Sequence, residues 1–384
     1  IMTDDIDLEN ASDYEPIGYP SVNGKPFQGI FDGNGYEIKN LYVNTPSTSN
    51  SGLFGKCQDA LIQNLTVSGE VNGKDYVGGI VGSIFRYTEH FENYGIQNCV
   101  SYVNVTGTEA AGGIVGHVYN SEIIKCVNFG TVTSKGASGI VSTSLGGQVK
   151  ECVNFGTING VADSTSEYAA GIIGSITTVS SSNISSCYNA GTIVKPADSK
   201  ATGANLNYAF LVGNGTTALT ASNNYYLNSS MQFTGAAGFD DSEATFCRTT
   251  YDVFVNDLSK NAPFNNWSET VIYNGQSYIV PVKCKYDHTS YKDISDYSTL
   301  PDNVRDFAIN SDSDLRKLST WAQSSTLSGY NFYVTESFAM TSSSFTPIGS
   351  TSKKFNGCFN GLGNNISNLT ITGNSDYMAL FGYG

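Results

Sequence analysis

Residues 112–116 read Gly-Gly-Ile-Val-Gly, and the same five letters occur at residues 78–82. Close variants of this phrase lie at residues 52–55, 138–142 and 171–174. A second phrase, Cys-Val-Asn-Phe-Gly-Thr-Val at 126–132, returns with small changes at 152–158 and 187–193. Phrases that return at regular spacing indicate a repeat protein, in which each unit packs mainly on its neighbours.

The spacing of the second phrase gives the length of one unit. Cys99 to Cys126 is 27 residues and Cys126 to Cys152 is 26, while the step of 35 to Cys187 is interpreted as the same unit with an inserted loop. Each unit holds short β-type runs separated by Gly, Asn or Ser, and no run has a helical period. The pattern predicts an all-β fold, a parallel β-helix of roughly eight coils stacked about 4.8 Å apart.

The repeated letters have structural roles in such coils. Glycines are expected at corners, where they permit tight bends and close approach of neighbouring backbones. These corner glycines are Gly78, Gly79, Gly82, Gly112, Gly113 and Gly116. Ile114 and Val115 would supply a β-branched pair to the core. Asn128, Asn154 and Asn189 are expected to stack at one corner, with their amides hydrogen-bonded along the stack.

Four cysteines occupy one repeat position and are expected to stack as a buried ladder: Cys99, Cys126, Cys152 and Cys187. Free thiols that fill the core are the preferred interpretation, because Leu65 has this position one unit earlier. A redox or disulfide ladder is the alternative, since the coil spacing falls inside the Cα separation that a disulfide permits. Cys247 and Cys284 follow the repeats and are predicted to pair in an oxidising compartment.

Composition narrows the range of partners. Charged residues make up 14% of the chain and the net charge is −14. We find no cluster of Lys and Arg, so a nucleic-acid partner is not expected, because phosphate binding requires clustered basic residues. No stretch approaches 18 consecutive apolar residues, so we expect no membrane span in this sequence.

The repeats suggest a division into four segments. Residues 1–228 are expected to form the β-helix, and residues 229–285, which have many aromatics but no period, an aperiodic β-rich cap over its end. Residues 286–310 are interpreted as a connector. Residues 311–384 are expected to begin a second module with a short helix, in which Ser311 caps the N-terminus and Leu315 and Leu318 lie on one face.

The second module copies the start of the chain. Pro347-Ile348-Gly349 repeats Pro16-Ile17-Gly18 at a distance of 331 residues, and residues 355–363 repeat 27–35. We therefore expect the sequence to be a window from a longer tandem array.

These phrases resemble the GLUG-motif family, whose signature appears here as Gly52-Leu53-Phe54-Gly55. The resemblance covers most of residues 15–215 and resumes at 315–384. It implies a right-handed parallel β-helix in a secreted or surface-attached, adhesin-like protein. No catalytic residue is carried over, because the motif positions are structural.

The candidate functional residues lie in one inserted loop. Arg86, Tyr87, Glu89, His90 and Glu92 form its richest cluster and are candidates for ligand contact, with a solvated insertion as the simpler alternative. We find no catalytic constellation, no zinc-ligand spacing and no cofactor motif, so no catalytic, metal or cofactor site is expected.

Further candidates are weaker. Tyr225 and Tyr226 are aromatic residues that could contact a carbohydrate. Glycosylation sequons occur at Asn64, Asn104, Asn228 and Asn368, but in a chain this rich in Asn, Ser and Thr their number is close to chance.

Three functional hypotheses remain open. The first is an extracellular or cell-surface, non-enzymatic structural or adhesive protein, whose tandem β-helix modules form a stalk or filament. Its partners would be other copies or modules of the same protein, or cell-surface glycans and proteins. The second is a β-helix protein that binds or cleaves carbohydrate. The third is a non-catalytic region of a surface protease.

Overall fold

The structure is a computed structural model. It describes residues 1–18, 25–87, 94–162, 167–177, 182–194, 206–209, 211–214, 219–227, 245–248, 251–274, 276–284, 292–301, 304, 306–325, 327, 330–341, 343–355, 357–361, 364–372 and 378–382. The chain divides into two compact units, residues 1–270 with 278–284 and residues 271–277 with 285–384. Each unit is described by itself.

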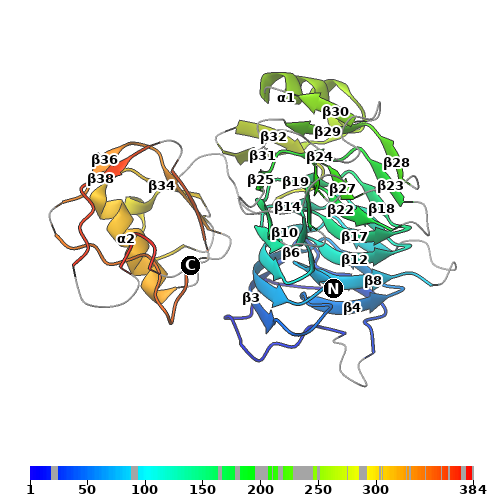
Figure 1. Ribbon diagram of the computed structural model, residues 1–384, viewed down its shortest axis with the longest axis horizontal. Helices are drawn as coiled ribbons and strands as arrows, with labels where there is room; N and C mark the ends of the chain where they lie inside the picture. Colours follow the sequence, from blue (N-terminus) through cyan, green and yellow to red (C-terminus); the bar gives the residue numbers. More distant parts are fainter. Residues whose placement is uncertain are drawn as a thin grey trace. The chain divides into compact units, whose positions relative to one another are not determined.

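The first unit is a parallel β-solenoid, as predicted, and its strands form four stacked sheets (Figure 1). Sheet 1 comprises β2 (Ile30–Asp32), β5 (Leu61–Gln63), β9 (Gly95–Gln97), β13 (Glu122–Ile124), β18 (Gln148–Lys150), β23 (Ser182–Ser185) and β28 (Leu219–Ser222). Sheet 2 comprises β1 (Ile6–Asp7), β3 (Glu37–Thr45), β6 (Thr66–Gly73), β10 (Val100–Gly107), β14 (Val127–Asn128), β15 (Val132–Ser134), β19 (Val153–Asn154), β20 (Ile158–Gly160), β24 (Tyr188–Asn189), β25 (Ile193–Val194), β29 (Asn224–Leu227) and β30 (Thr245–Arg248).

The other two sheets complete each coil. Sheet 3 comprises β7 (Val77–Gly78), β11 (Ala110–Gly112), β16 (Gly136–Ser138), β21 (Glu167–Ala170) and β26 (Leu206–Ala209). Sheet 4 comprises β4 (Phe54–Gln58), β8 (Val81–Phe85), β12 (Val115–Tyr119), β17 (Val141–Leu145), β22 (Ile173–Ile176) and β27 (Val212–Asn214). A coil such as β9, β10, β11 and β12 passes once through all four sheets.

The register confirms the period read from the sequence. Val100 pairs with Val127 and Val127 with Val153, which are steps of 27 and 26 residues. Val153 pairs with Tyr188 across the longer step, so the inserted residues leave the strand pairing unchanged. Equivalent positions of the repeat therefore lie directly above one another along the solenoid.

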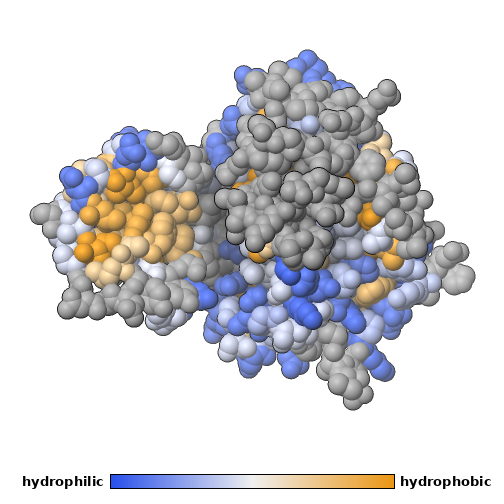
Figure 2. Space-filling model, in the orientation of Figure 1, coloured by the Kyte–Doolittle hydropathy of each residue, from blue (hydrophilic) through white to orange (hydrophobic). Residues whose placement is uncertain are grey.

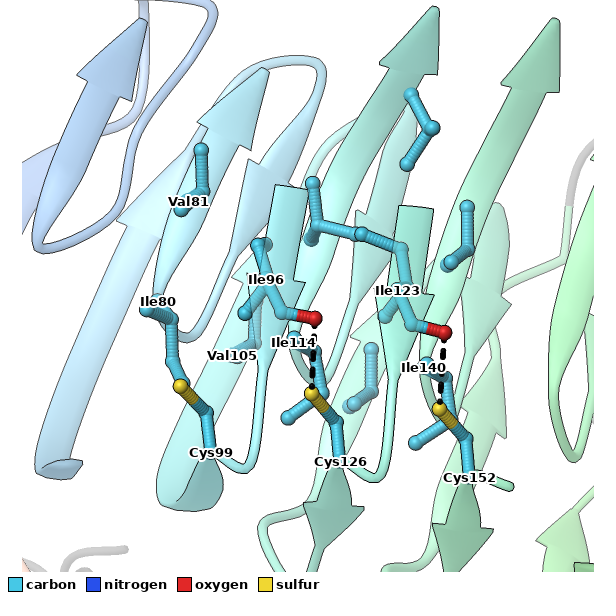
Figure 3. Close-up of a cluster of buried hydrophobic side chains, with 14 of the residues drawn as sticks. Ile80, Val81, Ile96, Cys99, Val105, Ile114, Ile123, Cys126, Ile140 and Cys152 are labelled. Atoms are coloured by element: carbon cyan, nitrogen blue, oxygen red, sulfur yellow. Dashed lines mark hydrogen bonds between the residues drawn. The ribbon is translucent and has the colours of Figure 1, made fainter. Parts of the chain in front are cut away.

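The core is a narrow column of aliphatic side chains and thiols. Ile80, Ile114 and Ile140 repeat one core position on three successive coils, and all are fully buried (Figure 3). Because this position keeps the same side chain on successive coils, the column packs there without a change of shape from coil to coil.

Glycines lie where neighbouring coils come close together. A Cβ on Gly113 would lie 2.2 Å from the carbonyl oxygen of Gly139 and 2.4 Å from Cγ of Asn128. The same contact recurs one coil earlier, where a Cβ on Gly79 would lie 2.3 Å from the Gly113 oxygen. Close approach of backbone therefore explains the second glycine of the Gly-Gly-Ile-Val phrase.

The left-handed corners of the coils lie elsewhere. On successive coils, the residue just before the repeat position of the ladder cysteines has φ between 53° and 55°. These residues are Asn64, Asn98, Lys125, Glu151, Ser186 and Asn223. Asparagine tolerates this backbone region better than lysine or glutamate. We did not predict this column, because the side chains that occupy it vary.

The end of the first unit differs from the expected β-rich segment, because it contains a helix. It is built from α1 (Tyr251–Lys260) and the 3-10 turn η3 (Phe264–Asn266), and the paired strands β31 (Glu269–Tyr273) and β32 (Gln276–Val280) follow, of which residues 271–277 belong to the second unit. Phe254 and Leu258 of α1 are fully buried. Tyr251, Phe254 and Leu258 have helical spacing, and their burial outweighs the strand propensity of the neighbouring valines.

This segment packs against the outer face of sheet 2. The Tyr188 ring lies 5.4 Å from the Phe254 ring, and its hydroxyl donates to the Ile279 carbonyl at 2.7 Å. Trp267 Nε1 donates to Glu151 Oε2 at 3.0 Å. The segment therefore covers aromatic side chains on the outside of the last coils.

The second unit contains the helix that the sequence predicts. Its elements are β33 (Lys292–Asp293), the 3-10 turn η4 (Ile294–Asp296), β34 (Asp306–Ile309), α2 (Asp312–Ser324), β35 (Asn331–Val334), β36 (Phe338–Ala339), β37 (Cys358–Asn360) and β38 (Ile366–Ser367). Ser311 caps α2 by accepting a hydrogen bond from the Asp314 amide, and Leu315 and Leu318 are buried. Figure 2 shows apolar residues gathered over one area of this unit.

Strand pairings in the second unit repeat those at the start of the first. Ile348 forms a parallel bridge with Phe381, as Ile17 does with Phe54. The pairing of β36 with β38 likewise repeats that of β1 with β3. The 331-residue repeat in the sequence is thus also a repeat of strand pairing. Within residues 286–310, where we expected a connector, the structure has β33, η4 and β34.

Candidate functional site: an aromatic strip on the solenoid

Two residues of the predicted ligand-contact loop lie at the end of β8. The Arg86 amide donates to the Tyr119 carbonyl at 3.0 Å, and the Tyr87 amide donates to Asp59 Oδ1 at 2.9 Å. The Arg86 guanidinium lies 4.6 Å from the centre of the Tyr94 ring, a cation–π contact. The other three candidates, Glu89, His90 and Glu92, fall outside the described residues.

Tyr87 belongs to a group of rings that we call the aromatic strip: Tyr76, Phe85, Tyr87, His117 and Tyr119. The Tyr87 ring is parallel to the Phe85 ring within 2°, with centroids 6.1 Å apart, and lies 5.5 Å from the Tyr119 ring. The His117 ring lies 5.5 Å from Phe85 and 4.8 Å from Tyr76. Tyr87 is 63% exposed, so one end of the strip faces solvent.

Strand register brings these rings together. Phe85 of β8 pairs with Tyr119 of β12, and Ser83 pairs with His117. Ile84 and Val118, which alternate with them, are fully buried in the core. Side chains on either side of a core residue point to the opposite face of the sheet, so the rings lie on the outer surface.

The strip is confined to two coils. The column that holds Phe85 and Tyr119 continues to Gln58 on the preceding coil and to Leu145 on the following one. The column that holds His117 continues to Ser83 and Thr143. The rings are therefore a local departure from the repeat, which a coil-to-coil comparison of the sequence could have found.

His117 has an unusual environment within the strip. It stands between the rings of Tyr76 and Phe85, and burial lowers its pKa from 6.5 to about 4. Its Nδ1 atom is buried and accepts or donates no hydrogen bond within the described part of the chain. The imidazole is therefore neutral at physiological pH and extends the aromatic surface.

A carboxyl pair that we did not predict adjoins the strip. Burial, and then the nearby Glu109 carboxylate, raise the pKa of Asp75, which immediately precedes Tyr76. Glu109 itself forms an ion pair with Lys135 at 3.4 Å. A carboxyl group that stays protonated to higher pH beside a second carboxylate is an arrangement that can serve acid–base chemistry.

The four ladder cysteines are buried free thiols. Each sulfur faces a carbonyl of the preceding coil; Cys126 Sγ lies 3.6 Å from the Ile96 oxygen and Cys152 Sγ 3.4 Å from that of Ile123 (Figure 3). Burial raises the pKa of Cys99, Cys126 and Cys152 well above the ordinary thiol value. A thiol that stays protonated is a poor nucleophile, so burial favours the preferred interpretation as core filler.

The asparagine stack is also present. Asn128 Nδ2 donates to Asn154 Oδ1 at 2.9 Å, and Asn154 Nδ2 donates to Asn189 Oδ1 at 2.8 Å. Each amide also bonds the backbone of the glycine two residues later, as Asn154 does with Gly156. All three side chains are fully buried. Their role is to hold corners in register.

Other predicted sites have mixed outcomes. Tyr225 and Tyr226 are only 2% and 4% exposed, so the suggestion that they contact a carbohydrate is wrong. Cys284 is a free thiol, and the side chain of Cys247 lies outside what the structure describes, so their pairing stays a prediction.

The glycosylation candidates also remain untested. Asn64 and Asn104 have amide oxygens that accept hydrogen bonds from neighbouring coils, Asn368 is exposed, and Asn228 is not described. Modification at any of the four stays a prediction.

No family model matches the chain, so the GLUG-motif resemblance stays an expectation. A 110-residue match, 30% identical, joins it to a protein named Halomucin from Haloquadratum walsbyi, covering 21% of this chain and 1% of that protein. A 106-residue match, 31% identical, joins it to a "Putative Gly-rich membrane protein" from Evansella cellulosilytica, covering 26% of this chain and 11% of that protein. The chain thus spans a small part of both relatives.

One solved structure has a related shape. It is that of a "putative immunoglobulin A1 protease" from Bacteroides ovatus, with a TM-score of 0.48 and 20% identity, and the match covers 72% of this chain and 84% of that one. Among the described residues, none of the helices has the length and apolar character that crossing a bilayer requires.

Proposed function

We propose that the chain is a non-enzymatic spacer of a surface protein, in which solenoid modules repeat along the polypeptide to form a stalk or filament. The observation that carries this proposal is the repeated strand pairing, in which the bridge between Ile348 and Phe381 copies that between Ile17 and Phe54. A chain that starts the same solenoid twice can extend by adding modules.

The packing of the first unit supports a mechanical role. The parallel pairings of Val100, Val127, Val153 and Tyr188 form one continuous ladder, and the buried asparagine stack runs beside it. The three coils that hold Asn128, Asn154 and Asn189 are thus bonded to one another by backbone and side chain together. Such a unit bends little, because a shift of one coil breaks both sets of bonds.

The comparisons support a location at the cell surface. One relative is named a membrane protein and the other a halomucin, and the match to each is confined to a fraction of the relative's length. On intact cells that express the natural protein, a membrane-impermeant label should reach these residues. Labelling only after cell lysis would contradict the proposed location.

The spacer role is tested by the shape of a chain with added modules. Residues 1–330 would be joined two, three and four times, and each product studied by small-angle X-ray scattering. We expect the maximum dimension to grow by a constant increment per copy while the radius of the cross-section stays unchanged. Compact particles, whose radius of gyration grows only as the cube root of mass, would contradict the proposal.

A polysaccharide-cleaving β-helix is the second candidate, and one observation favours it. Asp75 has a raised pKa beside Glu109, as a general acid beside a second carboxylate would. The ion pair between Glu109 and Lys135 argues for a structural role instead. Release of reducing ends from a polysaccharide panel, abolished by Asp75→Asn, would establish this candidate and refute the non-enzymatic function.

A further inference from the structure

We propose that the aromatic strip binds a neutral glycan, whose pyranose rings stack on Tyr87, Phe85 and Tyr119. This binding site goes beyond the spacer role and does not depend on it. A surface spacer with such a site would also attach to uncharged polysaccharide.

The rings provide a continuous platform of the right kind. The Tyr87 ring is stacked parallel to the Phe85 ring, within 2° and with centroids 6.1 Å apart, and the Tyr119 ring lies 5.5 Å from Tyr87 at an angle of 40°. The C–H faces of a pyranose are apolar and pack on flat aromatic rings, while the tyrosine hydroxyls remain available to sugar hydroxyls. Tyr87, at 63% exposure, is the entry point.

The platform is fixed before any ligand arrives. Phe85 and Tyr119 are opposite residues on paired strands, and the core side chains Ile84 and Val118 anchor those strands from the other face. The Tyr87 amide is held by Asp59 Oδ1. A site built on rigid strands loses little conformational entropy on binding, so weak stacking contacts suffice.

Polar groups border the strip on one side. Gln58 is the neighbour of Phe85 in the outward column, and its Nε2 lies 3.5 Å from Asp59 Oδ2. An amide and a carboxylate next to aromatic rings can exchange hydrogen bonds with the hydroxyls of a sugar.

The negative charge near the strip favours a neutral ligand over an anionic one. The Asp59 carboxylate stands at the edge of the strip and the chain carries a net charge of −14. The Arg86 guanidinium is placed over the Tyr94 ring rather than over the strip. A uronate or sulfated glycan would therefore be repelled, whereas a neutral one would not.

The repeat itself supplies substitutions that the fold tolerates. Phe85→Gln copies the residue that Gln58 places in the same column one coil earlier, and Tyr119→Leu copies Leu145 one coil later. Tyr87→Ala removes the exposed ring. Tyr42→Ser is the matched control, because it removes a half-exposed tyrosine from β3 of sheet 2, whereas the strip lies on β8 and β12 of sheet 4.

The test applies the full 384-residue chain to a printed array of neutral, sialylated and sulfated glycans. We expect binding to neutral glycans alone. Binding should fall at least tenfold in Tyr87→Ala and in Phe85→Gln, and it should be unchanged in Tyr42→Ser. The thermal unfolding midpoint should be the same in all three variants as in the unmodified chain. Absence of neutral-glycan binding, preference for charged glycans, or binding that the strip variants leave intact would each overturn the proposal.

Experiments on this chain distinguish the glycan-binding proposal from the spacer proposal. Cleavage of a bound neutral glycan would support the site while overturning the non-enzymatic role. Both proposals would be supported if Tyr87→Ala abolished glycan binding while the maximum dimension measured by X-ray scattering still grew by the same increment per copy.

Discussion

Asn154 donates from Nδ2 to Oδ1 of Asn189 at 2.8 Å, across two coils that the sequence separates by 35 residues. The same Asn154 accepts from Asn128 and bonds both backbone polar groups of Gly156. One buried amide thus satisfies partners on three coils. Removing it leaves several buried groups unpaired at once.

Asn154→Ala is accordingly expected to lower the free energy of unfolding by about 3 kcal/mol, since loss of one partner of a buried hydrogen bond costs roughly 1–3 kcal/mol and several are lost here. Urea denaturation followed by circular dichroism measures the change. The control is Asn159→Ala, which removes one bond of 3.3 Å to Thr133 in a half-buried position. Equal losses in the two variants would show that the stack has no special role.

Lys125→Asn is expected to stabilise the chain. Lys125 has φ 53° in the corner column, where Asn98 stands one coil earlier. Asparagine adopts this region at lower cost than lysine, so we expect a gain of about 0.5–1 kcal/mol. The ion pair that is lost, between Lys125 and Glu151 at 3.9 Å, is long and partly exposed, so it contributes little. A lower unfolding midpoint in urea would contradict the assignment of these corners.

His117 should make the stability depend on pH. Its folded pKa of about 4 lies below its ordinary 6.5, so between these values the unfolded chain binds a proton that the folded chain does not. Stability is therefore full above about pH 6.5 and falls as the pH drops towards about 4. His117→Thr copies Thr143 and should remove this part of the pH dependence. Parallel curves of unfolding free energy for both proteins between pH 7 and 4.5 would refute it.

Thiol labelling should separate the cysteines by burial. Cys57 and the four ladder thiols are fully buried, whereas Cys284 is partly exposed with its pKa raised to about 12. With iodoacetamide at pH 8, mass spectrometry of digests should show modification at Cys284 before any of these five buried thiols. Those five should react only at the rate of global unfolding. Rapid alkylation of Cys126 in the native chain would mean that the solenoid core opens locally.

The coil period and the two side-chain stacks could be predicted because the repeat imposes them. When Cys126 and Cys152 recur at the spacing of one coil, stacking follows from the geometry of parallel strands. The helix α2 was likewise predictable, because Ser311 supplies a cap and Leu315 and Leu318 have helical spacing.

Features that depend on single coils could not be predicted in the same way. α1 has two valines with strand propensity, and only the burial of Phe254 and Leu258 decides for a helix. Of the rings in the aromatic strip, Tyr87 alone was identified from the sequence as a candidate for ligand contact. The other rings lie outside the loop, and they are found only when Phe85 is aligned with Tyr119 across the 34-residue step of one coil. The corner column was missed because only its backbone is conserved along the coils.

The central claim is that the solenoid is a stiff spacer, and pulling a single molecule by its ends tests this most directly. The account predicts that a chain of joined copies of residues 1–330 keeps its length as force rises and then lengthens in discrete steps, one solenoid at a time. Asn154→Ala should lower the force at which each step occurs. Smooth lengthening at low force, as an unstructured polypeptide shows, would contradict it.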